Sequence, residues 1–107
     1  MRIIDTGITK EILTGDNHPQ LKIGNELFTV DDRQSTWEKI QEVQKREDLN
    51  ENEKTNLIYE LALGKEDADK LKSMDLPVSS AIYLSYCIMG AIIGEEPKKL
   101  MEDSRKN

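Results

Sequence analysis

Sixteen consecutive residues, Val78 to Ile93, carry no charge, although the rest of the chain is densely charged. All 15 basic and 21 acidic residues lie outside this run, which Pro77 precedes and Gly94 follows. A helical membrane span needs ~20 predominantly apolar residues. The run is shorter than that, and it contains three serines and two tyrosines. We therefore predict a helix that is buried within a soluble protein.

Apolar side chains surround most of this predicted helix. At 100° per residue, Val78, Ile82, Met89 and Ile93 lie together, and Tyr83, Leu84, Cys87, Ile88 and Ala91 spread around the other sides. Such a helix is either a plain core helix or one that shares its apolar surface between the core and a partner. Aromatic and methionine side chains are favoured at interfaces. The predicted partner contacts are therefore Tyr83, Tyr86, Met89 and Ile93.

The composition indicates one small, helix-rich domain. Of its 107 residues, 34% are charged and only 5% are aromatic. We predict a mainly α fold of the α+β type, with four to five helices and one N-terminal β-hairpin packed against them. Its predicted parts are an irregular arm (1–19), the hairpin (20–30), a helical core (32–94) and a charged tail (95–107) with a short, fraying helix.

The clearest β signal surrounds Gly24-Asn25, a dipeptide that suits a two-residue hairpin turn. This turn places Ile23 opposite Glu26. Four apolar side chains then share one face of the hairpin: Leu21, Ile23, Phe28 and Val30. Because a two-stranded hairpin is marginally stable alone, we expect this face to pack on helices.

Capping residues predict where the first helix begins. Ser35-Thr36-Trp37-Glu38 fits a capping box, with Ser35 as the N-cap residue. Asp31 or Asp32 would suit an earlier start. The helix is expected to run to about Glu47, with Trp37, Ile40 and Val43 on its inner side.

The later helices are bounded by further capping and breaking residues. Asn50 is predicted to cap a helix that ends at Gly64, with Leu57, Ile58, Leu61 and Ala62 as its inner stripe. A short helix follows over 65–73, with Ala68 and Leu71 inward. Pro77 suits the first turn of the uncharged helix, and Gly94 ends it.

The sequence contains no catalytic or metal-binding pattern. His18 is the single histidine, and Cys87, the single cysteine, is expected to be a buried, inert thiol. No glycine-rich phosphate loop or nucleophile elbow is present. The net charge of −6 opposes nucleic-acid binding, which needs clustered basic residues. We therefore expect no enzyme activity, cofactor or metal, and no nucleic-acid or membrane partner.

The order of motifs resembles the tail assembly chaperones of siphovirus-type phages and prophages of Gram-positive bacteria. The resemblance is carried by LIYELALGKEDA over 57–68, by MDLPVS over 74–79, by the uncharged helix, and by GEE over 94–96. The stretch FTVDDR over 28–33, which follows the hairpin turn, is also similar to the N-terminal part of that family. The similarity covers roughly residues 20–96.

This resemblance implies a non-catalytic protein of the bacterial host cytoplasm. Members of the family bind the long, aggregation-prone tape measure protein before the tail tube polymerises around it, and arriving tube subunits displace them. A longer form often arises by ribosomal frameshifting. The expected partner is thus the tape measure protein, with the tail tube protein and a second copy of the chain as further candidates.

Two other classes of function stay open at this point. A small acidic regulatory or adaptor protein that binds another phage or host factor would show the same charge and the same uncharged helix. An enzyme would require a cluster of carboxylates with perturbed pKa values in a deep pocket.

Overall fold

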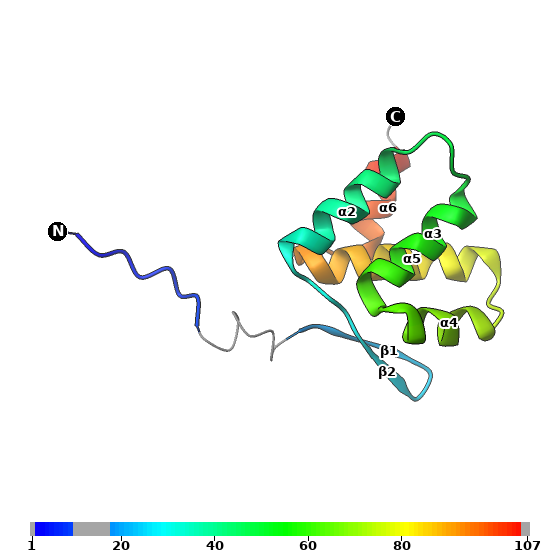
Figure 1. The fold of residues 1–107 in the computed structure, drawn as a ribbon, viewed down its shortest axis with the longest axis horizontal. Helices are drawn as coiled ribbons and strands as arrows, with labels where there is room; N and C mark the ends of the chain where they lie inside the picture. The colour runs from blue at the N-terminus through cyan, green and yellow to red at the C-terminus, as the bar shows by residue number, and fades with distance from the viewer. Residues whose placement is uncertain (1, 10–17, 106–107) are drawn as a thin grey trace.

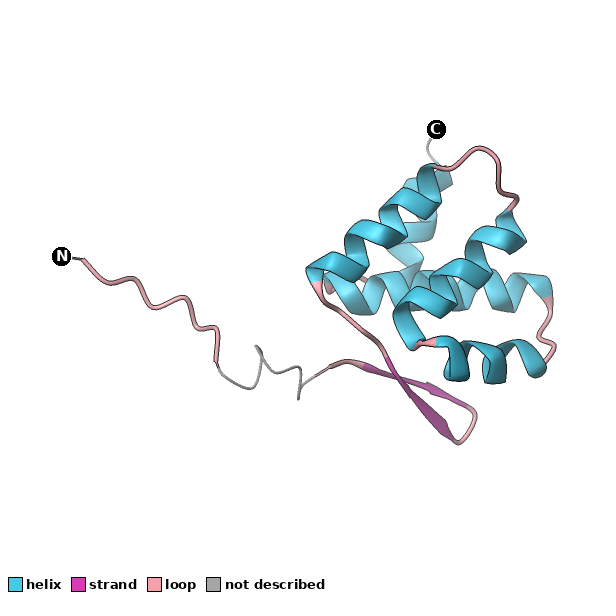
Figure 2. Ribbon diagram, viewed as in Figure 1, coloured by secondary structure: helices cyan, strands magenta, loops and turns pink. Residues whose placement is uncertain are grey.

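The computed structural model describes residues 2–9 and 18–105. Within these residues the chain forms a two-stranded antiparallel sheet and five helices (Figure 1, Figure 2). In chain order they are β1 (Gln20–Ile23), β2 (Glu26–Thr29), α2 (Gln34–Lys45), α3 (Glu51–Leu63), α4 (Lys65–Ser73), α5 (Val78–Ile93) and α6 (Pro97–Arg105). The predicted mainly α fold with an N-terminal hairpin is confirmed. Residues 10–17 of the predicted arm lie outside the described residues.

Helix α3 packs against three other helices, α2, α4 and α5, while α6 packs on α5. The core draws side chains from the hairpin and from α2, α3, α4 and α5. Its buried apolar residues are Phe28, Val30, Ile40, Val43, Ile58, Tyr59, Ala62, Leu63, Ala68, Leu71, Ile88 and Met89. The uncharged segment is therefore a core helix along part of its surface, as its composition predicted.

The hairpin has the predicted register, with Leu21 opposite Phe28. Its predicted inner face is covered, since Leu21 and Ile23 are half-buried and Phe28 and Val30 are buried. Lys70 of α4 contacts the hairpin. Its Nζ lies 3.0 Å from Glu26 Oε1 and 5.8 Å from the centroid of the Phe28 ring. This exposed ion pair adds a contact with α4 to the packing of the buried hairpin face on the core.

Helix α2 begins in a different way from the prediction. Its N-cap residue is Arg33, and no side chain caps the helix there. The capping box of Ser35 and Glu38 is therefore wrong, and neither Asp31 nor Asp32 occupies the N-cap position. The helix also ends at Lys45, before the predicted end at about Glu47.

Asp31 supplies the physical reason for this start. Its Oδ1 accepts a hydrogen bond from the backbone N–H of Arg33 at 3.1 Å, and its Oδ2 accepts one from the Thr36 hydroxyl at 2.8 Å. The Arg33 guanidinium donates to both carboxylate oxygens, at 2.9 and 2.8 Å. One carboxylate outside the helix therefore fixes the first turn, in place of an N-cap side chain.

The other helix limits follow their local signals. Asn50 and Glu53 form a capping box at the start of α3, and Gly64, with φ of 85°, ends it. Helix α4 has the predicted bounds, and Gly94 ends α5 in the left-handed conformation with φ of 73°. Pro77 is the N-cap residue of α5 and not part of its first turn as predicted, so the helix begins at Val78.

Replacing Asn50 with alanine should remove the capping box. Asn50 Oδ1 accepts from the Glu53 N–H at 2.8 Å, and the Glu53 carboxylate accepts from the Asn50 N–H at 3.1 Å. We expect the free energy of unfolding to fall by about 1 kcal/mol, measured by urea denaturation. Asn52→Ala, at an exposed position of the same first turn, is the matched control. Equal stability of the two variants would contradict this role for the cap.

The connection between α5 and α6 folds tightly over Gly90. The Glu95 N–H donates to the Gly90 carbonyl at 2.9 Å, which is the 6→1 bond of a Schellman motif, and the Gly94 N–H donates to the same carbonyl. A Cβ atom on Gly90 would clash with the backbone oxygen of Glu95.

Within the described residues, no single helix is long and apolar enough to cross a membrane. Helices α5 and α6 reach that length and apolar composition only when taken together, as a pair bent by 107°.

The close contact at Gly90 predicts that alanine at this position lowers the stability of the protein. Glycine to alanine inside a helix usually stabilises it by up to ~1 kcal/mol. Here backbone atoms must move to make room for the Cβ, so we expect Gly90→Ala to destabilise the protein by roughly 1–3 kcal/mol. Thermal unfolding measures the change, with Ser79→Ala at an exposed position of α5 as the control. A variant more stable than the wild type would show that the connection between α5 and α6 does not lie this close to Gly90.

Candidate partner-binding surface

Helix α5 leaves part of its uncharged surface in contact with solvent. The Tyr83 side chain is 47% exposed, Val78 and Ile93 are also exposed, and Ile82 and Tyr86 are half-buried. At 100° per residue these five positions lie within about 140° of the helix circumference. We call this set, Val78, Ile82, Tyr83, Tyr86 and Ile93, the α5 face.

The other side of α5 is held firmly in the core. Ile88 and Ser85 are buried, and the Tyr59 hydroxyl of α3 donates a hydrogen bond to the Ala81 carbonyl at 2.6 Å. Burial raises the pKa of Tyr59 to about 12, so this hydroxyl stays protonated and remains a donor. These contacts fix the rotation of α5 and hence which side chains the α5 face presents.

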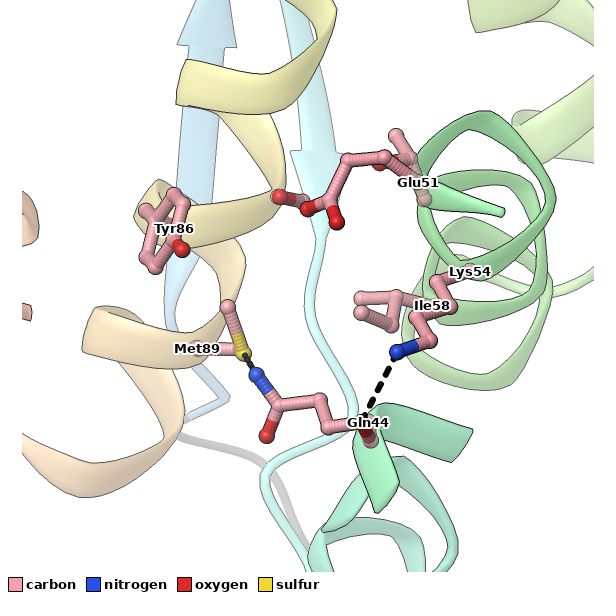
Figure 3. Close-up of a pocket in the computed structure, with 8 residues that line it drawn as sticks. Gln44, Glu51, Lys54, Ile58, Tyr86 and Met89 are labelled. Atoms are coloured by element: carbon pink, nitrogen blue, oxygen red, sulfur yellow. Dashed lines mark hydrogen bonds between the residues drawn. The ribbon is translucent and has the colours of Figure 1, made fainter. Parts of the chain in front are cut away.

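A small pocket lies beside the α5 face, between α5, α3 and the end of α2 (Figure 3). It has a volume of about 160 Å³. Its wall on α5 includes Tyr86 and Met89, and its remaining lining is Gln44, Glu51, Lys54, Thr55, Ile58 and Ser85. The side-chain amide nitrogen of Gln44 lies 3.0 Å from Met89 Sδ. Lys54 Nζ donates to the backbone carbonyl of Gln44 at 3.0 Å. The pocket thus joins an apolar wall to a polar one.

The structure separates the four predicted contact residues by exposure. Tyr83 and Ile93 are exposed and Tyr86 is half-buried, whereas Met89 is only 3% exposed, beneath Gln44. Met89 therefore reaches a partner only through the pocket that it lines. That these four residues bind a partner stays a prediction.

Sequence patterns did not point to the polar wall of the pocket. Gln44, Glu51 and Lys54 belong to two different helices, and each looks like an ordinary solvent-facing residue in its own helix. Their proximity to Met89 depends on the angle at which α2 and α3 cross α5. No local pattern encodes that angle.

The one cysteine lies next to Tyr83, one helical turn along. Cys87 is half-buried, somewhat less covered than predicted. Burial raises the pKa of its thiol, and a hydrogen bond with Tyr83 partly offsets that effect. The same hydrogen bond is the main cause that raises the pKa of the Tyr83 hydroxyl. Both groups are therefore protonated at neutral pH, which leaves this part of the surface uncharged.

Polar groups near the start of α2 form ion pairs and hydrogen bonds. His18 Nδ1 lies 2.6 Å from Asp32 Oδ1, and no group of three or more His, Cys, Asp or Glu side chains there could hold a metal ion. Asp31 is bound by Arg33 and Thr36, as described above. These ionic contacts lie at the junction between the hairpin and α2.

The Asp31 cluster predicts an acid-sensitive contribution to stability. Hydrogen bonds from Arg33 hold the pKa of the Asp31 carboxyl below its usual range. The contribution is therefore complete above the unfolded pKa of ~3.9 and is lost as the pH falls below that value toward the folded pKa. Asp31→Asn should lower the free energy of unfolding by roughly 1–2 kcal/mol at pH 7, and by less near pH 3.

Urea denaturation at the two pH values checks this expectation. Asp69→Asn, at an exposed position of α4, serves as the matched control. A difference between Asp31→Asn and the wild type that does not depend on pH would show that the Asp31 charge contributes nothing.

Comparison of the chain with protein-family models, with curated proteins and with solved structures finds no match.

Proposed function

We propose that this chain is a tail assembly chaperone of a phage or prophage, which binds the tape measure protein in the bacterial cytoplasm without catalysing a reaction. The observation that carries the proposal is the α5 face, an uncharged surface on a protein of net charge −6. The resemblance of residues 20–96 to that family supports the identity of the client.

The chemistry of the α5 face suits an apolar helical client. Tyr83 offers a large ring near the middle of the length of α5, and Val78 and Ile93 extend the apolar surface toward the two ends of the helix. The pocket beside Tyr86 has room for part of one client side chain. An amphipathic client helix would bury its apolar stripe on this face and leave its polar side in water.

The acidic surface supports the second part of a chaperone's task. A tape measure protein is long and prone to aggregate, so a bound chaperone must keep the complex soluble. The excess of 21 acidic over 15 basic residues lies outside α5, and mutual repulsion between bound copies would oppose coaggregation. The α5 face would thus bind the client, and the acidic surface outside α5 would keep the complex soluble.

Co-expression tests the proposal directly. The tape measure protein of the same phage or prophage is expressed alone and together with this chain, and its soluble fraction is measured. We expect a soluble complex that a tag on either protein captures. A tape measure protein that stays insoluble and is not captured would reject the proposal and favour the regulatory or adaptor role.

A further inference from the structure

The N-terminal arm carries apolar residues that the proposed function does not use. Residues 2–9 extend away from the rest of the protein (Figure 1), and Ile3 is 88% exposed, with Ile4 and Ile8 also exposed. Five of these eight residues are β-branched: Ile3, Ile4, Thr6, Ile8 and Thr9. That composition is typical of a strand, although the arm forms none within the described residues.

The hairpin has an edge that can accept such a strand. The Val30 N–H donates to the Pro19 carbonyl at 2.9 Å, so this pair is hydrogen-bonded. Because antiparallel pairs alternate, the N–H and C=O groups of Leu27 and Thr29 point away from β1. In the described part of the chain, no backbone hydrogen bond joins these groups to another element. The Asp31 N–H, two residues beyond Thr29, donates to the Ala62 carbonyl at 2.8 Å, so the free part of this edge ends at Thr29.

The two edges of the hairpin differ in how they are protected. On β1 the outward-pointing backbone groups belong to Gln20 and Lys22, and an edge lysine opposes strand addition. On β2 the corresponding residue is Leu27, whose side chain is 62% exposed on the solvent face. The edge of β2 thus combines unpaired backbone groups with an uncovered apolar side chain.

We propose that residues 2–6 of a second copy of this chain pair with the open edge of β2. Successive side chains of a strand point to opposite faces. In either register, one of Ile3 and Ile4 therefore covers Leu27, and the other lies on the core side of the sheet. The proposed strand ends before Gly7, which has a positive φ of 75° and whose N–H donates a hydrogen bond to the Asp5 carboxylate at 2.9 Å.

A second copy is the favoured source of the strand because of the order of the chain. The arm of the same copy precedes β1, so it would have to cross the hairpin to reach β2. A neighbouring copy brings its arm to β2 without that crossing. Two copies that exchange arms reciprocally form a closed twofold dimer, which leaves each α5 face available to a client.

The test measures the mass of the full chain in solution by size-exclusion chromatography with light scattering, at high micromolar concentration. We expect the wild type to have twice the chain mass of 12.3 kDa. The double variant Ile3→Asp/Ile4→Asp should have the single-chain mass. Arg2→Asp, which changes the net charge by the same two units and keeps both isoleucines, should remain dimeric.

Proline substitutions identify the edge. Leu27→Pro removes an outward N–H of β2, and Lys22→Pro removes one of β1, and neither N–H takes part in the ladder. Circular dichroism verifies that both variants remain folded. We expect Leu27→Pro to be monomeric and Lys22→Pro to be dimeric. A monomeric wild type, or a dimer that survives both the isoleucine and the Leu27 changes, would overturn the proposal.

Discussion

Met89→Asp is expected to unfold much of the population at room temperature. Met89 is 3% exposed, and its sulfur lies 3.0 Å from the Gln44 amide nitrogen. Truncating a buried methionine typically costs about 2–5 kcal/mol, and the desolvation of a carboxylate at this buried position adds to that cost. Small domains have roughly 5–15 kcal/mol of stability in total, so one such change removes a large share of it.

Two control variants separate the causes of this loss. Met89→Leu keeps the volume and the apolar character, and should cost less than about 1.5 kcal/mol. Tyr83→Asp places the same charge on the exposed side of the same helix and should change stability little. Urea denaturation followed by circular dichroism measures all three. If Met89→Asp were as stable as Tyr83→Asp, α5 could not have the rotation described above.

Most of the fold could be predicted from local signals. Gly24-Asn25 defined the hairpin, Asn50 and Gly64 bounded α3, and Gly94 ended α5. Each of these residues acts through its own backbone conformation or through a neighbour a few positions away. Such effects are visible in the sequence because they do not depend on the rest of the fold.

The start of α2 was predicted wrongly because it depends on the geometry at the end of the hairpin. The sequence offered Ser35 as the capping residue, with Asp31 and Asp32 as alternatives. In the structure Asp31 bonds to the Arg33 backbone and to Thr36 without occupying the N-cap position. The sequence supplied the right carboxylate but could not show which geometry it adopts at the end of the hairpin.

The candidate surface could be predicted only in part. The uncharged helix could be predicted from its composition, but the exposure of Tyr83 could not, because no pattern in the helix distinguishes its inner side from its outer side. By contrast, Met89 and Ile93 lie on the same stripe of the helix, yet one is buried and the other exposed. Gln44, which is 45 positions before Met89 in the chain, covers the middle of that stripe, and such a long-range contact leaves no periodic pattern.

Tyr83→Asp is expected to remove client binding while leaving the fold intact. The variant places a carboxylate on the exposed α5 face, where an apolar client helix would have to desolvate it. Large aromatic residues are often hot spots of an interface, each contributing about 2 kcal/mol or more to binding, so we expect affinity to fall by at least roughly 30-fold. Gln41→Asp adds the same charge at an exposed position of α2 and should bind as the wild type does.

The decisive measurement is the amount of soluble tape measure protein captured by the wild type, Tyr83→Asp and Gln41→Asp after co-expression. All three proteins are first shown to have similar unfolding temperatures. If the α5 face binds the client, the wild type and Gln41→Asp capture soluble tape measure protein and Tyr83→Asp does not. Equal capture by all three, or capture by none, would contradict a chaperone that uses this surface.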